Sequence, residues 1–245
     1  MPLLFVAAGA FAATMLGGAL ALRLRDNLHL ILGFSAGAVV AVAFFDLLPE
    51  ALDLAGGVHS AATVMSFVAL GFLLYLLMDR LLVLHSHAHE EGDESARGHV
   101  RAGSLSLHSF LDGVGIGLAF HVSTAVGVVV AVAVLTHDFS DGINTVNVVM
   151  RHLPDGKAGG GAFKKALRWL LVDAVAPVLG IVATLFISVS QPVLGLMLAL
   201  FAGFFLYIGA SDLIPESHHA HPTFWTTFMT ILGAGVLFAA IRLAA

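Results

Sequence analysis

The sequence predicts an all-α integral membrane protein with eight transmembrane helices. Of its 245 residues, 59% are hydrophobic and only 11% are charged, and the mean hydropathy is +0.97. An average soluble domain is about half apolar and about a quarter charged, so this chain has too few charges to cover a water-soluble fold. A transmembrane helix needs roughly 20 mostly apolar residues, whereas barrel strands are about ten residues long and alternate in polarity. The eight long apolar stretches are 3–22, 28–50, 61–84, 103–122, 125–150, 164–189, 192–216 and 222–243.

Composition also excludes several classes of function. The chain has no cysteine, which rules out disulfide frameworks, thiolate metal sites and cysteine nucleophiles. A formal net charge of −5 does not suggest a nucleic-acid partner. The first apolar stretch has no basic residue before it, and Arg23 and Arg25 follow it. A secretory signal has its basic residues first, so we expect this stretch to be retained as a span.

The distribution of basic residues predicts the orientation. With eight spans, one side of the membrane carries only Arg242, and the other side carries the ten remaining basic residues. These are Arg23, Arg25, Arg80, Arg97, Arg101, Arg151, Lys157, Lys164, Lys165 and Arg168. Cytoplasmic loops are enriched in Lys and Arg, so both termini are expected outside the cytoplasm.

Residues 1–245 are expected to form one transmembrane domain with two polar cytoplasmic segments. Segment 85–102 is rich in histidine and acidic residues, and segment 151–163 is a basic, glycine-rich linker. Spaced imidazoles bind metal ions, so His85, His87 and His89 are candidates for metal capture on the exit side. The alternative is an ordinary solvated loop.

An internal repeat links the second and seventh spans. The first copy occupies 36–50 and consists of Ala-Gly, eight further residues and Asp-Leu-Leu-Pro-Glu. The second copy occupies 202–216 and consists of Ala-Gly, eight further residues and Asp-Leu-Ile-Pro-Glu. These two spans run in opposite directions, as an inverted-topology repeat requires, and such repeats build many transporters. Pro49 and Pro215 are expected to break their helices near opposite ends. The acids of the repeat are therefore candidates for cation attraction at the two mouths of a route, or for ordinary helix termination. They are Asp46, Glu50, Asp212 and Glu216.

The densest group of ionisable residues lies on the fourth and fifth spans. Each span carries a His-x-x-x-Asp-Gly motif, formed by His108 and Asp112 on one and by His137 and Asp141 on the other. Spacing of i, i+4 puts both side chains of a motif on one helix face. Two facing motifs offer two imidazoles and two carboxylates, with Asp138 beside them, which suits a divalent cation such as Zn²⁺, Fe²⁺ or Mn²⁺. The alternative is polar pairing between helices, but ionisable groups within spans usually mark a pathway or site.

These motifs resemble those of the ZIP (Zrt/Irt-like) divalent-metal transporters. The family typically carries His-Asn-x-Pro-Glu-Gly on span four, where this chain has His-Ser-Phe-Leu-Asp-Gly at 108–113. Span five of the family carries a His or Gln, then an acid or Asn, then a Glu one turn later. By this resemblance the chain has a 3+2+3 arrangement of eight spans, both termini outside, and a site bundle that moves against the other helices. The resemblance also implies a homodimer. Its transport ligands are His108, Asp112, His137 and Asp141, with Asp138 at a neighbouring second position.

The chain departs from the family at that second position. Two-metal members also use the span-four Asn and a span-six Glu before a Pro, but this chain has Ser109 and Ala176-Pro177, with Asp173 one turn earlier. We therefore expect one well-formed metal site, with Ser109 and Asp173 as the only candidates for completing a second position.

The leading functional hypothesis is a secondary transporter that moves a divalent transition metal into the cytoplasm. Zn²⁺ is the first expectation, with Cd²⁺, Fe²⁺ and Mn²⁺ as alternatives, and the metal is substrate rather than a permanent cofactor. The chain is not expected to be an enzyme, and its short loops suggest a bacterial inner membrane. The alternatives are an intramembrane zinc-dependent lipid hydrolase and a metal sensor without flux. The absence of a His-Glu-x-x-His motif argues against the hydrolase.

Overall fold

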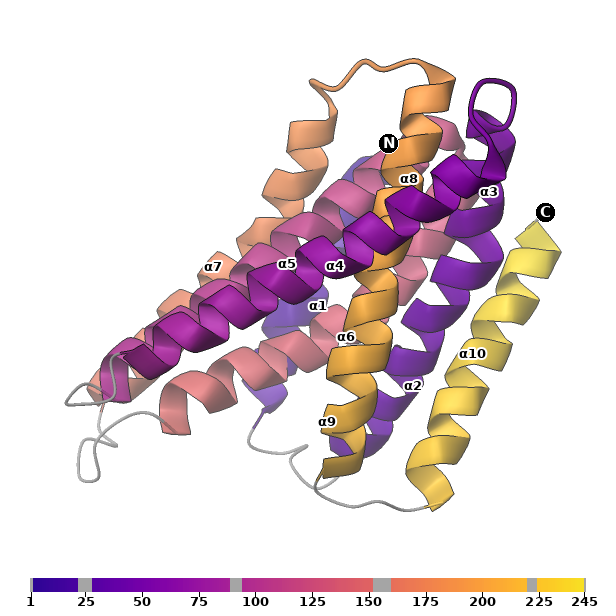
Figure 1. The fold of residues 1–245 in the computed structure, drawn as a ribbon. Helices are drawn as coiled ribbons and strands as arrows, with labels where there is room; N and C mark the ends of the chain where they lie inside the picture. The colour runs from indigo at the N-terminus through magenta and orange to yellow at the C-terminus, as the bar shows by residue number, and fades with distance from the viewer. Residues whose placement is uncertain (1, 22–27, 89–93, 152–159, 220–223, 245) are drawn as a thin grey trace.

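The computed structural model describes residues 2–21, 28–88, 94–151, 160–219 and 224–244. These residues form a helical bundle without β-strands in the described ranges (Figure 1). The elements are α1 (Pro2–Leu20), α2 (Leu28–Val42), η2 (Ala43–Leu47), α3 (Leu48–Ala55), α4 (Ala61–Ala88), α5 (Glu94–Val122), α6 (Thr124–Arg151), α7 (Gly160–Thr184), α8 (Gln191–Tyr207), η3 (Ile208–Leu213), α9 (Ile214–His219) and α10 (Phe224–Ala244).

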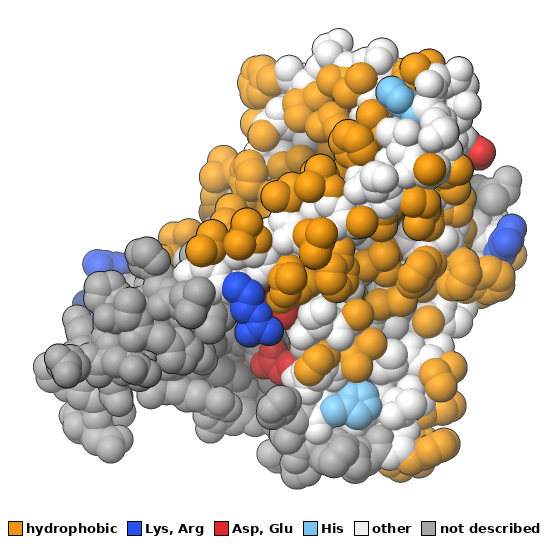
Figure 2. Space-filling view, viewed as in Figure 1, with side chains coloured by type: hydrophobic (Ala, Val, Ile, Leu, Met, Phe, Trp, Pro, Cys, Tyr) orange, Lys and Arg blue, Asp and Glu red, His pale blue; other side chains and the backbone are white. Residues whose placement is uncertain are grey.

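Eight helical segments of the described chain are long and apolar enough to cross a membrane, which confirms the predicted number of spans. Hydrophobic side chains are spread over the described surface on the face drawn in Figure 2, with few charged side chains among them, as expected of a surface that faces lipid. The sixth span is shorter than predicted, because α7 ends at Thr184 and the chain turns before α8. The turn contains Leu185, Phe186 and Ile187, whose hydropathy resembles that of a continuing span.

The second and seventh spans do not end at their prolines, which corrects the expectation drawn from Pro49 and Pro215. A π-helical segment, η2 or η3, precedes each proline, and the helix then continues as α3 or α9. A proline has no N–H and its ring clashes with the carbonyl four residues earlier. Those carbonyls belong to Phe45 and Ser211, which lie inside the π-helical segments, so the wider turn accommodates the ring.

Helices also enter the two predicted polar segments. Helix α4 runs through Ala88 and α5 begins at Glu94, so within 85–102 only residues 89–93 lie outside the described helices. In the same way α6 ends at Arg151 and α7 begins at Gly160.

The site bundle consists of α1, α5, α6 and α7, whose backbones touch at glycines. A Cβ atom built on any of four glycines would lie 1.9–2.1 Å from a backbone carbonyl oxygen of the neighbouring helix. The glycine and carbonyl pairs are Gly17 with Phe139, Gly142 with Thr14, Gly113 with Pro177, and Gly180 with Phe110. Glycine is therefore required where α1 meets α6 and where α5 meets α7.

The wall consists of α2, α4, α8 and α10, which make the same kind of contact with one another. Gly37 of the first repeat copy lies against the Thr230 carbonyl of α10, and Gly203 of the second copy lies against the Val68 carbonyl of α4. The repeat copies thus present equivalent glycines to different partner helices. Figure 1 places α3 and α9, the ends of the two copies, at opposite ends of the bundle, and both termini toward one end.

Candidate metal site

Helices α5 and α6 bring the two His-x-x-x-Asp motifs face to face. One ligand atom from each of His108, Asp112, His137 and Asp141 can be chosen so that all four lie within 4.8 Å of one another. The Nε2 atoms of both histidines lie 3.1 Å from Oδ2 of Asp112, and His108 Nε2 lies 3.5 Å from Oδ2 of Asp141. All four residues are buried. The i, i+4 spacing and the Gly contacts of α5 and α6 with other helices place these side chains inside the bundle.

The second ring nitrogen of each histidine has its own partner. His137 donates from Nδ1 to the carbonyl oxygen of Ala133, one turn earlier on α6, at 3.1 Å. His108 Nδ1 makes a hydrogen bond with the hydroxyl group of Tyr75 on α4. Metal-binding histidines usually use one ring nitrogen in this way, which leaves the other free for the metal. Both Nε2 atoms are therefore oriented as ligands.

The carboxylates of the site are poorly satisfied by protein donors. Asp112 Oδ1 and Asp141 Oδ2 are buried and accept no hydrogen bond from the described residues. Because His137 donates from Nδ1, a neutral imidazole would direct its Nε2 lone pair at the Asp112 carboxylate. That contact is unfavourable unless a proton or a metal ion lies between the two atoms. Burying unpaired carboxylates is costly, and a bound cation removes the cost.

Asp138 lies beside this group but is not one of its four members. Its side chain is 0% exposed, and neither carboxylate oxygen accepts a hydrogen bond from the described part of the chain. Its charge acts on His137, which precedes it. Asp138 is thus a buried acid next to the four candidate ligands.

The residues expected at a second position contact each other. Asp173 of α7 accepts hydrogen bonds of 2.8 Å from the hydroxyl groups of Ser109 on α5 and Thr145 on α6. All three side chains are buried. Sequence reasoning did not identify Thr145, which is one of many hydroxyl residues in the spans. Asp173 therefore joins three helices of the site bundle through both of its oxygens.

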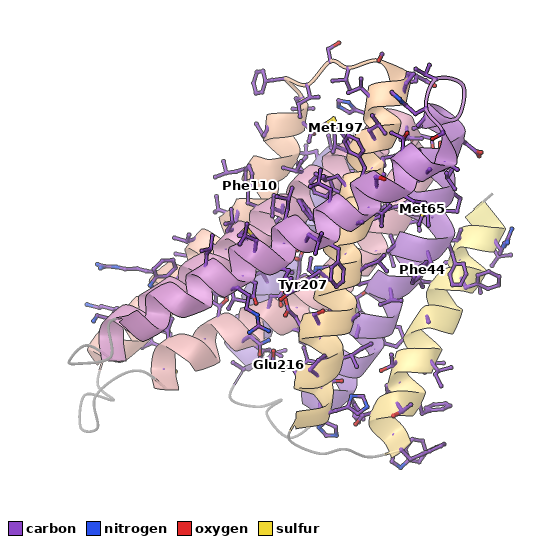
Figure 3. All side chains as sticks on the ribbon, in the orientation of Figure 1. Phe44, Met65, Phe110, Met197, Tyr207 and Glu216 are labelled. Atoms are coloured by element: carbon purple, nitrogen blue, oxygen red, sulfur yellow. The ribbon has the colours of Figure 1, made fainter. Side chains whose placement is uncertain are left out.

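None of the acids of the repeat is a member of the four-residue group. Asp46 and Glu50 lie on η2 and α3, and Asp212 and Glu216 lie on η3 and α9, at the other end of the bundle (Figure 1). Asp46, Glu50 and Asp212 are partly buried, Glu216 is exposed, and one buried oxygen of Asp46 has no hydrogen-bond partner among the described residues. Figure 3 shows Tyr207 midway along the bundle and Glu216 nearer the α9 end. The structure thus distributes these acids along the bundle.

Two candidates for metal capture, His85 and His87, lie on the last turns of α4. The side chains of these two residues are outside the described part of the structure. His89 lies outside the described residues altogether. Tyr75, which contacts His108, was missed by sequence reasoning. The available signal was composition, because the chain has only two tyrosines and both lie within apolar spans.

Comparison with known proteins agrees with this geometry. Residues 85–241 match the sequence profile described as ZIP Zinc transporter. The zinc transporter ZupT of Corynebacterium aurimucosum is 27% identical over 252 residues, which cover 94% of this chain and 92% of the relative. The zinc transporter YKE4 of Saccharomyces cerevisiae is 24% identical over 229 residues, covering 81% and 63%. The human zinc transporter ZIP6 is 30% identical over 114 residues, covering 46% and 14%. Because the profile matches well over half of the chain, this eight-span protein belongs to the ZIP zinc transporter family.

Proposed function

We propose that this protein carries a divalent transition metal, Zn²⁺ foremost, into the cytoplasm. The observation that supports the proposal best is the buried group of His108, Asp112, His137 and Asp141, whose ligand atoms lie within 4.8 Å of one another. The metal would exchange water for two imidazole nitrogens and two carboxylate oxygens. Its release would follow when the site opens to the other side.

The donor set favours transition metals over Mg²⁺. Imidazole suits Zn²⁺, Fe²⁺ and related ions, whereas Mg²⁺ prefers oxygen ligands and retains water. The named relatives are zinc transporters, which supports Zn²⁺ as the first choice. Cd²⁺, Fe²⁺ and Mn²⁺ are the alternatives, because aspartate in place of the family's glutamate alters the reach of two ligands.

The route would run between the two ends of the repeat. Asp46 and Glu50 at one end, and Asp212 and Glu216 at the other, would attract cations to the mouths. Matched glycine contacts of the two repeat copies, within α2 and α8, support an inverted repeat and hence alternating access about a central site. The distribution of Lys and Arg supports termini outside the cytoplasm, and the short loops support a bacterial inner membrane. A homodimer is a further prediction.

The two alternative functions receive less support. A lipid hydrolase would keep its metal and leave a coordination position open for water. The family and its named members are transporters, in agreement with the prediction that the chain is not an enzyme. A sensor would bind metal without moving it, so flux is the measurement that separates it from a carrier.

The test is metal uptake by sealed proteoliposomes that contain a fluorescent chelator. Zn²⁺, Cd²⁺, Fe²⁺, Mn²⁺ and Mg²⁺ are compared for the wild type, for His108→Ala and for Asp112→Ala. His121→Ala is the matched control, because His121 is an exposed histidine on the same helix. We expect saturable uptake of a transition metal that both site variants abolish and the control retains. Binding without uptake of any metal would refute transport and favour the sensor.

A further inference from the structure

The site bundle and the wall meet differently from the helices inside each group. Within each group, backbones touch at glycines, as described above. Between the groups, Gly115 of α5 faces the rings of Phe201 and Phe205 on α8, so side chains fill the boundary. Alternating access requires one part of the protein to move against another. None of the glycine–carbonyl contacts described above crosses this boundary, so movement along it leaves them intact.

Two side-chain hydrogen bonds in the described structure cross this boundary beside the candidate metal ligands. Tyr75 of α4 bonds to Nδ1 of His108, and Ser35 of α2 donates to the carbonyl oxygen of Thr136 at 3.1 Å. Thr136 immediately precedes His137. The wall thus contacts one imidazole directly and the backbone next to the other.

Tyr75 is held firmly by the wall. It is 5% exposed, and its ring packs against Phe204 and Tyr207 of α8, with ring centroids 5.7 and 5.2 Å away. The ring therefore has little freedom, and the position of its hydroxyl group is set by α4 and α8. A rigid partner for Nδ1 fixes both the orientation of the His108 ring and the nitrogen that carries its proton.

We propose that Tyr75 is a positioning residue that prepares His108 for metal binding from across the moving boundary. When His108 Nε2 binds the metal, Nδ1 carries the proton, and this N–H group donates a hydrogen bond to the Tyr75 oxygen. The hydrogen bond exists while the bundle sits against this part of the wall, and movement of the bundle along the wall breaks it. High affinity is thereby confined to one position of the bundle, and the metal is held less tightly once the bundle has moved. This inference rests on the proposed transport function for its kinetic part only.

Two consequences distinguish positioning from a general structural role. Loss of the hydroxyl group weakens metal binding, because the His108 ring and its tautomer are no longer fixed. The same loss does not slow the turnover of bound metal, because the bond has to break during movement. A purely structural defect would instead lower the amount of active protein, which reduces Vmax and leaves KM unchanged.

The experiment compares Tyr75→Phe with Tyr207→Phe. Tyr207 is the matched control, because its hydroxyl group donates to Asp79 at 3.0 Å and both residues belong to the wall. The dissociation constant for Zn²⁺ is measured on purified full-length protein in detergent, and the binding stoichiometry gives the folded fraction. Uptake into proteoliposomes then gives KM and Vmax for each folded protein.

For Tyr75→Phe we expect the dissociation constant and KM for Zn²⁺ to rise roughly tenfold, the lower end of what lost histidine partners cost. Vmax should equal or exceed that of the wild type, and Tyr207→Phe should leave both constants unchanged. An unchanged dissociation constant in Tyr75→Phe would overturn the proposal, as would an equal rise in Tyr207→Phe or a fall in Vmax alone. If the wild type binds Zn²⁺ but shows no uptake, the transport function fails, and the dissociation constants still decide whether Tyr75 positions His108.

Discussion

Replacing Gly113 by alanine tests whether the site depends on direct backbone contact between α5 and α7. The added Cβ atom would lie 2.0 Å from the carbonyl oxygen of Pro177, and such atoms essentially never approach closer than 3.0 Å. The two helices must therefore separate by about 1 Å. Overpacking of this kind typically costs about 1–3 kcal/mol. For a chain of this size, that cost lowers Tm by roughly 2–12 °C.

The separation should also reach the polar contacts next to the metal site. Asp112 precedes Gly113 on α5, and the bond between Ser109 and Asp173 joins α5 to α7 at 2.8 Å. Moving these helices apart by about 1 Å takes that bond beyond the usual range for a hydrogen bond. We therefore expect the lower Tm to come with weaker Zn²⁺ binding, because the candidate ligand Asp112 is displaced together with Gly113 on α5.

Gly103→Ala is the control on the same helix. Its Cβ atom would meet only the Trp169 ring, at 3.8 Å, which is an ordinary contact. Alanine is a better helix former than glycine, so this variant should match or slightly exceed the wild type. Tm is measured by heating detergent-solubilised protein and quantifying the folded fraction by size-exclusion chromatography. Equal Tm values for Gly113→Ala and Gly103→Ala would refute the requirement for close backbone contact.

Two further predictions concern Asp173 and the two candidate histidine ligands. Asp173→Asn should lower Tm, because Asp173 is engaged by Ser109 and Thr145. It should leave the Zn²⁺ affinity almost unchanged, with one metal bound per chain. A loss of affinity of tenfold or more, or two metals per wild-type chain in equilibrium titration, would contradict this. Zn²⁺ affinity should fall as pH decreases, because protons compete with the metal for the ring nitrogens of His108 and His137. Isothermal titration at several pH values measures this dependence, and a flat profile would argue against imidazole ligands.

The number of spans and the grouping of the four candidate ligands could be predicted because each depends on local sequence. A span needs only a long apolar stretch, and i, i+4 spacing decides which face of a helix carries His108 and Asp112. The boundary predicted between the fourth span, 103–122, and the fifth span, 125–150, was also correct, since α5 ends at Val122 and α6 begins at Thr124.

Contacts between distant spans could not be predicted from the same information. Tyr75 reaches His108 only because α4 lies beside α5, and nothing in the local sequence around Tyr75 indicates that neighbour. Thr145 resembles every other hydroxyl residue in an apolar span until α6 and α7 bring it to Asp173. The π-helical turns are hidden for a different reason, because proline indicates a disturbance of the helix without deciding whether the helix ends or widens.

The two site motifs are alike at their ligand positions and differ at the residue that follows each histidine. On α5 that residue is Ser109, whose hydroxyl group is used by Asp173, and on α6 it is Asp138, whose oxygens have no hydrogen-bond partner in the described ranges. Two facing motifs therefore supply one four-ligand group and one additional carboxylate, rather than two equivalent metal positions. When ionised, this additional carboxylate would raise the attraction for a divalent cation. This asymmetry supports the prediction of a single well-formed metal site.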